Sequence, residues 1–86
     1  MRHLDWDDLR LFLAIARAGT LTAAADSLHL SQPTAGRRLR GLEQACGCAL
    51  FQRTPHGLRP TDEGELMLRH AVRIEAETLA LSREFA

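Results

Sequence analysis

The side chains best suited to binding a ligand lie between residues 22 and 43. Arg37, Arg38 and Arg40 closely follow Ser31 and Gln32. Guanidinium, amide and hydroxyl groups can hydrogen-bond phosphates and the edges of bases, so this combination is typical of nucleic-acid recognition. The alternative is a solvated basic face on an ordinary amphipathic helix, because such faces are common.

Two short helices joined by a tight turn are predicted to present these side chains. Thr22 is expected to cap the first helix, ahead of three alanines that are strong helix formers. The helical pattern breaks at residues 29–31. Ser31 is expected to cap the second helix, with Pro33 in its first turn, where a missing N–H costs little. Gly47 is expected to end it.

The second helix has an apolar side and a polar side. Its apolar stripe steps by four, three and four residues through Ala35, Leu39, Leu42 and Cys46. A major groove admits a helix, and the residues near the helix N-terminus usually reach the bases. The candidate DNA-binding residues of this helix pair are Thr22, Ser31, Gln32, Pro33, Thr34, Gly36, Arg37 and Arg40.

Residues 50–60 are predicted to form a basic hairpin, with strands at 50–54 and 58–60 and a turn at 55–57. Leu50 or Phe51 would attach the hairpin to the core, while Arg53 and His56 project from it and are further candidates for DNA binding. We favour a wing that binds phosphate beside the second helix. The alternative is a surface hairpin without a ligand.

Two further helices are predicted to flank this unit. The first begins at its cap Asp5 and ends at Gly19, with Arg10 and Arg17 facing solvent. The last begins after its cap Thr61 and continues to the end of the chain. Apolar residues recur along it at steps of four and three, and the expected dimer interface is Met67, Ala71, Ile74, Thr78, Leu81 and Phe85.

The length of this last apolar stripe predicts a partner for it. A domain of 86 residues buries a modest fraction of its surface and cannot easily cover so long a stripe. We therefore expect the helix to pair with the same helix of a second copy. The alternative is that its first half packs on the domain and the rest frays.

The formal net charge is zero, but the charges are unevenly distributed. Residues 1–60 carry eight arginines against five acidic residues, a net charge of +3. Residues 61–86 carry three arginines against six acidic residues, a net charge of −3. A basic body joined to an acidic helix fits a DNA-reading head with a tail that does not read DNA.

The remaining motifs point away from an enzyme, a metal site and a membrane protein. The four histidines lack ligand spacing, and no acid–base pair or nucleophile motif is present. Cys46 and Cys48 are too close for a relaxed disulfide and too closely spaced for the usual zinc half-site. No apolar run could span a bilayer. We expect a cytoplasmic protein without a cofactor, with a thiol-based sensor as one alternative.

One combination of short motifs extends from about Asp5 to Gly64. Its residues are Leu9 to Phe12, Gly19 to Ala25, Leu28 to Pro33, Arg37, Leu42-Glu43, Leu50-Phe51, Arg53-Thr54 and Gly57. The combination of Ala-Ala, Ser-Gln-Pro, Leu-Glu and Leu-Phe-x-Arg at these distances is highly specific, although no single piece would be. In these residues the chain resembles the LysR-type transcriptional regulators.

The resemblance implies a mainly α-helical fold with a small β-hairpin: a winged helix-turn-helix over residues 1–60, followed by a dimerisation helix over 61–86. In the family, the Gln32-Pro33 pair, the small residue at Gly36 and Arg37 face the major groove, and the wing Arg53 reaches the backbone or minor groove. The family usually has serine at position 36, arginine at 56 and leucine at 60.

The implied partner is double-stranded promoter DNA, and a two-fold dimer favours an inverted-repeat site. A small-molecule effector would bind only the larger domain that follows the long helix in this family. The rival hypothesis from another class is a winged-helix module that binds a partner protein. Salt separates the two, because binding through several phosphates weakens steeply as salt rises and an apolar protein contact does not.

Overall fold

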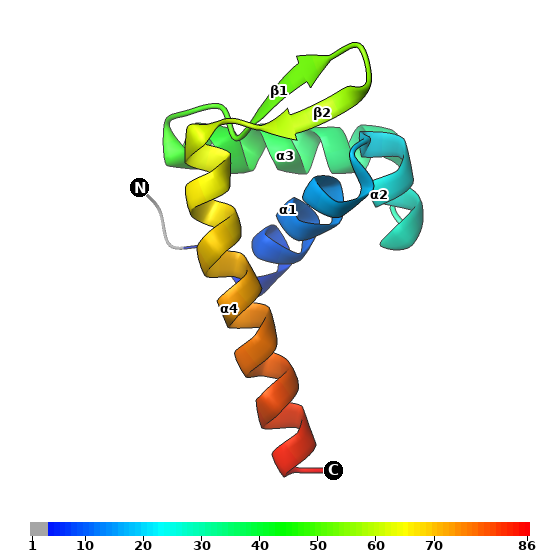
Figure 1. Ribbon diagram of the computed structural model, residues 1–86. Helices are drawn as coiled ribbons and strands as arrows, with labels where there is room; N and C mark the ends of the chain where they lie inside the picture. Colours follow the sequence, from blue (N-terminus) through cyan, green and yellow to red (C-terminus); the bar gives the residue numbers. More distant parts are fainter. Residues whose placement is uncertain (1–3) are drawn as a thin grey trace.

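The computed structural model describes residues 4–86, which form four helices and one hairpin. Helices α1, α2 and α3 pack into a compact body beneath the hairpin, and α4 leaves this body as a long rod (Figure 1). The predicted mainly helical winged helix-turn-helix fold is confirmed. The elements in chain order are α1 (Trp6–Ala18), α2 (Leu21–Ser27), α3 (Gln32–Cys46), β1 (Phe51–Thr54), β2 (Gly57–Pro60) and α4 (Asp62–Glu84).

The core is built around α1. Phe12 and Ile15 of α1 and Leu42 of α3 have no accessible surface. The rings of Phe12 and Phe51 lie 5.1 Å apart between centroids, so the first residue of β1 is attached to the core through an aromatic contact. Leu50 is buried beside it, as expected. Each side chain of this size stabilises the fold by about 1.5–3 kcal/mol when it is fully buried.

Side-chain caps define the helix starts, and three of the four were predicted. Asp5 forms a capping box with Asp8, Ser31 accepts from the Thr34 N–H at 3.2 Å, and Thr61 accepts from the Gly64 N–H at 3.1 Å. These bonds satisfy backbone donors that have no partner within the helix. The predicted helix ends at Gly19 and Gly47 are also confirmed, since both glycines adopt left-handed conformations.

The predicted cap of α2 is wrong. Thr20, not Thr22, occupies the cap position, and its hydroxyl accepts from the Ala23 N–H at 3.1 Å. The helix therefore begins at Leu21, whose half-buried side chain packs against the core. Thr22 lies in the first turn, and its hydroxyl donates to Gln32 Oε1 at 3.1 Å instead.

Two close backbone contacts fix the hairpin and the start of α4 on the body. A Cβ atom at Gly57 would overlap the carbonyl oxygen of Gly19, and one at Gly64 would overlap the carbonyl oxygen of Leu50. The Leu58 N–H donates to the same Gly19 oxygen at 2.8 Å. Gly57 also has a φ of 125°, which side chains rarely tolerate. Glycine is therefore required at both positions.

Helix α4 packs on the body from its start to about Glu75. Gly64 and Ala71 are buried, whereas residues 76–86 are exposed except for the half-buried Ala80. Ala71 was predicted to contact a second copy, but its side chain has no accessible surface in a single chain and packs on its own body. Within the described residues, the exposed large hydrophobic side chains all lie on α4 or at its C-cap: Leu66, Val72, Ile74, Leu79, Leu81 and Phe85.

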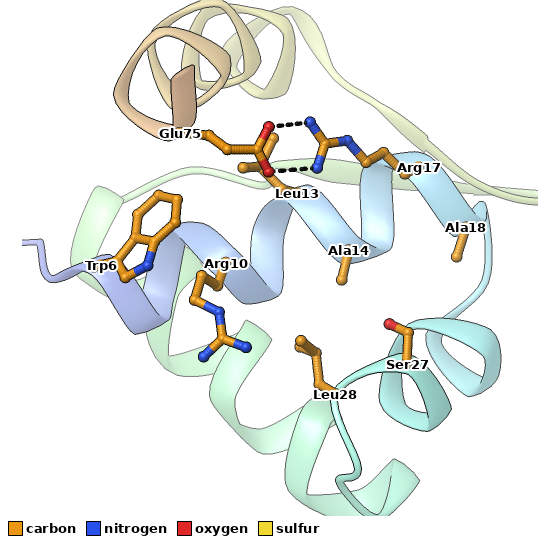
Figure 2. A pocket seen from close by; sticks show the side chains of 9 residues that line it. All are labelled: Trp6, Arg10, Leu13, Ala14, Arg17, Ala18, Ser27, Leu28 and Glu75. Carbon is orange, nitrogen blue, oxygen red and sulfur yellow. Dashed lines mark hydrogen bonds and ion pairs between the residues drawn. The ribbon is translucent and has the colours of Figure 1, made fainter. Parts of the chain in front are cut away.

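An ion pair joins α4 to α1. Arg17 Nη1 lies 2.7 Å from Glu75 Oε2, and Arg17 Nη2 lies 2.6 Å from Glu75 Oε1 (Figure 2). Arg17 is exposed, as predicted, but it also has a partner on α4 that the sequence did not predict. Arg10, two turns earlier on α1, is exposed and contacts only Asp7 of its own helix, at 3.4 Å, among the ion pairs described. Hydrogen bonds from Arg17 lower the pKa of Glu75 below its usual value of 4.5.

Replacement of Gly57 by alanine tests the first close contact. We expect Gly57→Ala to lower the free energy of unfolding by at least about 2 kcal/mol, because the new Cβ overlaps the Gly19 carbonyl and the φ is strained. Gly41→Ala is the matched control, since no atom lies within 4 Å of its Cβ position inside α3. This control should raise stability by up to about 1 kcal/mol. Urea unfolding followed by circular dichroism measures both, and equal effects would contradict the prediction.

The Arg17–Glu75 pair predicts a pH-dependent contribution to stability. The pKa of Glu75 is lower in the folded chain than in the unfolded chain, so its contribution is fully present above the unfolded value. The contribution is lost as the pH falls through the lowered folded-state pKa. We expect Glu75→Gln to destabilise slightly at about pH 7 and to have no effect at about pH 2. A loss of equal size at both pH values in urea titrations would show that the charge is not involved.

Candidate nucleic-acid interface

The exposed side of α3 follows from what its other side buries. Ala35, Leu39 and Leu42 pack into the core. Because the helix turns by 3.6 residues, the opposite side faces outward. The side chains that the structure leaves exposed there are Gln32, Pro33, Arg37 and Arg40.

A short, well-bonded turn sets α3 against α2. The Leu30 N–H donates to the Ala25 carbonyl at 2.9 Å, and the His29 N–H donates to the Asp26 carbonyl at 3.2 Å. His29 takes a φ of 57°, the left-handed conformation that reverses the chain. The break in the helical pattern at residues 29–31 therefore predicted the turn correctly, although the sequence carries no glycine there to mark it.

Two recesses lie along the exposed side of α3. The first, of about 450 Å³, is lined by Leu21, Gln32, Pro33, Gly36, Arg37 and Arg40. The second, of about 460 Å³, lies between α3 and the hairpin and includes Arg53 on β1. Leu21, Gln32, Gly36 and Arg40 line both. The front of α3 and the hairpin therefore form one concave basic surface, which we call the α3–wing surface.

Hydrogen bonds orient the polar side chains at the N-terminal end of this surface. Gln32 Oε1 accepts from the Thr22 hydroxyl, which leaves the Gln32 amide N–H groups available as donors. Arg37 Nη2 donates to Thr34 Oγ1 at 3.3 Å. Ser31 Oγ donates to the same Thr34 oxygen at 2.8 Å while it also caps the helix. Ser31 therefore has a structural role at the start of α3, and its side chain is also exposed.

Gly36 does not match its predicted exposure. It is buried, because the side chains of Leu21 and Arg40 lie over it. A Cβ atom at this position would lie 3.4 Å from Leu21 Cδ2 and 3.8 Å from Arg40 Nη1, which are ordinary contacts. A small residue therefore lets α2 approach α3 here. Gly36 therefore forms part of the floor of both recesses, beneath the Leu21 and Arg40 side chains.

The two candidate DNA-binding residues of the hairpin, Arg53 and His56, occupy different positions on it. Arg53 lies on β1 and opposes Leu58 of β2 in the antiparallel register. It lines the recess that it shares with α3. His56 is exposed in the turn between the strands, and its N–H donates to Thr54 Oγ1 at 3.2 Å. Arg53 therefore joins the α3–wing surface, whereas His56 lines neither of its recesses.

Glu43 is a residue whose role sequence reasoning missed. Its carboxylate accepts from the Leu50 N–H at 2.7 Å and from the Phe51 N–H at 3.4 Å. These bonds tie the C-terminal part of α3 to the start of the hairpin. The sequence contained a signal, an acidic residue among arginines, but its partner amides lie seven and eight residues away in an irregular segment.

Two other kinds of site are absent from residues 4–86. In that part of the chain no group of three or more His, Cys, Asp or Glu residues is placed to hold a metal ion. Nor does any of its helices have the length and apolar character needed to cross a membrane. Cys46 and Cys48 are both half-buried.

A helix-turn-helix with an arginine-bearing second helix and an adjacent hairpin defines a winged helix-turn-helix DNA-binding domain. Residues 6–65 match the family model described as "Bacterial regulatory helix-turn-helix protein, lysR family". The chain belongs to this family, as the resemblance in the sequence predicted.

Known proteins of the same kind are similar over almost the whole chain. The Mau operon transcriptional activator of Paracoccus denitrificans is 40% identical over 83 residues, which is 94% of this chain and 29% of that protein. The crystal structure of the CbnR_DBD–DNA complex is 35% identical, with a TM-score of 0.81 over 94% of each chain. The BenM_DBD/catB site 1 DNA complex is 26% identical, with a TM-score of 0.88 over 95% of this chain and 91% of that one. The chain spans less than a third of the length of the curated relatives it matches.

Proposed function

We propose that this chain binds double-stranded promoter DNA as a homodimer and thereby regulates transcription. In this proposal α3 enters the major groove and the hairpin lies on the backbone beside it. The observation that carries the proposal is the α3–wing surface, a concave surface with three guanidinium groups at Arg37, Arg40 and Arg53. The likeness to two domains solved in complex with DNA supports it. Since bacterial promoters lie in the cytoplasm, the chain would act there, and this role requires neither catalysis nor a cofactor.

The position of each side chain along α3 suggests its role. Gln32, Pro33 and Arg37 are exposed on the first half of α3, which usually reaches the base edges. Arg37 can donate two hydrogen bonds to guanine, and the free amide N–H groups of Gln32 can also donate to bases. Arg40 and Arg53 lie farther along the surface, where phosphate contacts position the protein. Thr22 and Thr34 orient Gln32 and Arg37, and the exposed His56 could reach phosphate at the rim.

The proposed dimer forms along one side of α4. An apolar groove of about 430 Å³ runs between α4 and the body, and Leu66, Met67 and Ile74 line it together with Leu9 and Cys46. Leu81 and Phe85 continue this side of the helix and are 58% and 86% exposed. We call Leu66, Met67, Ile74, Leu81 and Phe85 the dimer face. The heads of residues 4–60 would then be linked through α4 from residue 61 onward.

A second copy of α4 is the occupant that fits the dimer face. The apolar residues recur at steps of seven, seven and four from Met67 to Phe85, a helical spacing that an equivalent helix can match. Thr78 lies between them, and its hydroxyl donates to the Ile74 carbonyl at 2.9 Å, so its methyl group can join an apolar contact. A two-fold arrangement of this kind presents two α3 helices to the DNA and favours an inverted repeat.

Arginine replacements test the two proposed kinds of DNA contact. We expect Arg37→Ala to reduce discrimination between selected and scrambled duplexes by about 1–3 kcal/mol, because a base contact is lost. Arg53→Ala should weaken binding to both duplexes alike and reduce the slope of log K against log salt by about one. Fluorescence anisotropy at several salt concentrations measures both effects. Unchanged specificity in Arg37→Ala would show that the base-reading residues are assigned incorrectly.

The same titration separates the proposal from a protein-binding winged helix. A strong loss of duplex affinity with rising salt supports phosphate contacts. Absence of binding to any sequence selected from a random duplex pool at low salt would favour the protein-interaction module instead.

Charge placed on the dimer face tests the proposed assembly. We expect Leu81→Asp to shift the chain from dimer to monomer, because an unpaired carboxylate would be buried against the second helix. Leu79→Asp is the matched control, since Leu79 is similarly exposed, at 54%, but lies on the other side of α4. Sedimentation velocity measures the oligomeric state. A dimer that survives Leu81→Asp and dissociates in Leu79→Asp would place the interface on the other side of the helix.

A further inference from the structure

The Arg17–Glu75 ion pair lies where α4 leaves the body. Glu75 follows Ala71 by one helical turn, so the pair continues the face along which α4 is buried. Its two hydrogen bonds cross from α1 to α4 at the edge of a recess of about 450 Å³, which is lined mainly by α1 together with Ser27, Leu28 and Glu75 (Figure 2). Beyond this point α4 projects away from the body (Figure 1). The pair is therefore placed to control the direction of the projecting half.

The geometry of the pair suits it to fixing an angle. Two parallel N–H···O bonds between a guanidinium and a carboxylate constrain both distance and orientation. The neighbouring contacts of α4 are apolar, through Ala71 and the half-buried Met67 and Leu68, and such contacts specify orientation less strictly. The Glu75 side chain is 29% exposed and the Arg17 side chain 55% exposed, so the pair lies at the surface, where water reaches both groups.

A small change in the angle between α4 and the head moves the end of the chain by a distance comparable with one base-pair step. The long axis of the chain measures 42 Å. With a lever arm of about half that length, a rotation of about 10° moves one end of the chain by about 3.7 Å, close to the rise of about 3.4 Å for one base-pair step. Since half-site spacing is set by the geometry of a dimer, rotation of α4 against the heads would change the preferred spacing.

We propose that Arg17 and Glu75 are positioning residues that hold the head at a fixed angle to α4 and thereby set the half-site spacing that the dimer prefers. This inference rests on the proposed function, because it requires a dimer joined through α4. It concerns the separation of the two α3–wing surfaces, and neither residue of the pair lies on that surface.

The test is a spacing profile. An inverted repeat selected with the wild-type chain is altered so that its spacer is longer or shorter by one and by two base pairs, and affinity is measured for each duplex. Arg17→Ala and Glu75→Gln should reduce the preference for the best spacer over its neighbours by about threefold, a size typical of an exposed ion pair. The double charge swap, Arg17→Glu with Glu75→Arg, should restore a single preferred spacer. Arg10→Ala is the control, because Arg10 lines the same recess but contacts Asp7 of its own helix.

Two further measurements separate this effect from loss of folding or of DNA binding. Affinity for a duplex with one half-site should be the same in all variants, because the α3–wing surface is intact. Sedimentation should show a dimer throughout. If Arg17→Ala and Glu75→Gln keep the wild-type spacing profile, this inference is wrong while the proposed function stands. If the wild-type chain binds DNA only as a monomer, the proposed dimer and this inference both fail.

Discussion

Burial of the apolar stripe of α3 against α1 is the constraint on which the rest of the structure depends. Successive residues on a helix are about 100° apart, so the contact of Leu39 and Leu42 with the core decides which side chains face outward. A shift of the stripe by one residue would turn Arg37 and Arg40 away from the hairpin. The orientation of the basic surface is thus a consequence of hydrophobic packing, and the arginines themselves need no contact with the core.

Much of this arrangement could be predicted from the sequence because its signals are local. The ends of α3 are marked by residues at those ends, namely Ser31, Pro33 and Gly47. The spacing of its apolar residues gives its buried side. The cap of α2 is assigned to Thr22 from the sequence, whereas the structure uses Thr20, because Leu21 packs on the core as the first residue of the helix. The Arg17–Glu75 pair joins residues 58 positions apart, and no local pattern indicates such a contact.

The burial of Ala71 and Gly36 shows a different limit of sequence reasoning. A heptad pattern identifies an apolar side of a helix but does not say whether the covering atoms belong to the same chain or to a second one. Ala71 is covered by its own chain, and Ile74 three residues later is exposed. Gly36 is likewise part of a polar side by spacing, yet Leu21 of the neighbouring helix lies over it. Both outcomes depend on how closely two helices approach, which is set by tertiary packing.

The acidic residues explain how a chain without net charge can carry a basic surface. The first turn of α4 contains Asp62, Glu63 and Glu65, whose carboxylates interact favourably with the positive end of the helix dipole. Asp7 and Asp8 have the same role in the first turn of α1. Glu43 is the acidic residue that lines the recess beside Arg53, and its charge is directed to backbone N–H groups. Negative charge is therefore used where helix ends and a hairpin need acceptors. The charges of the arginines near Glu43 therefore face solvent, where they can attract phosphate over a long range.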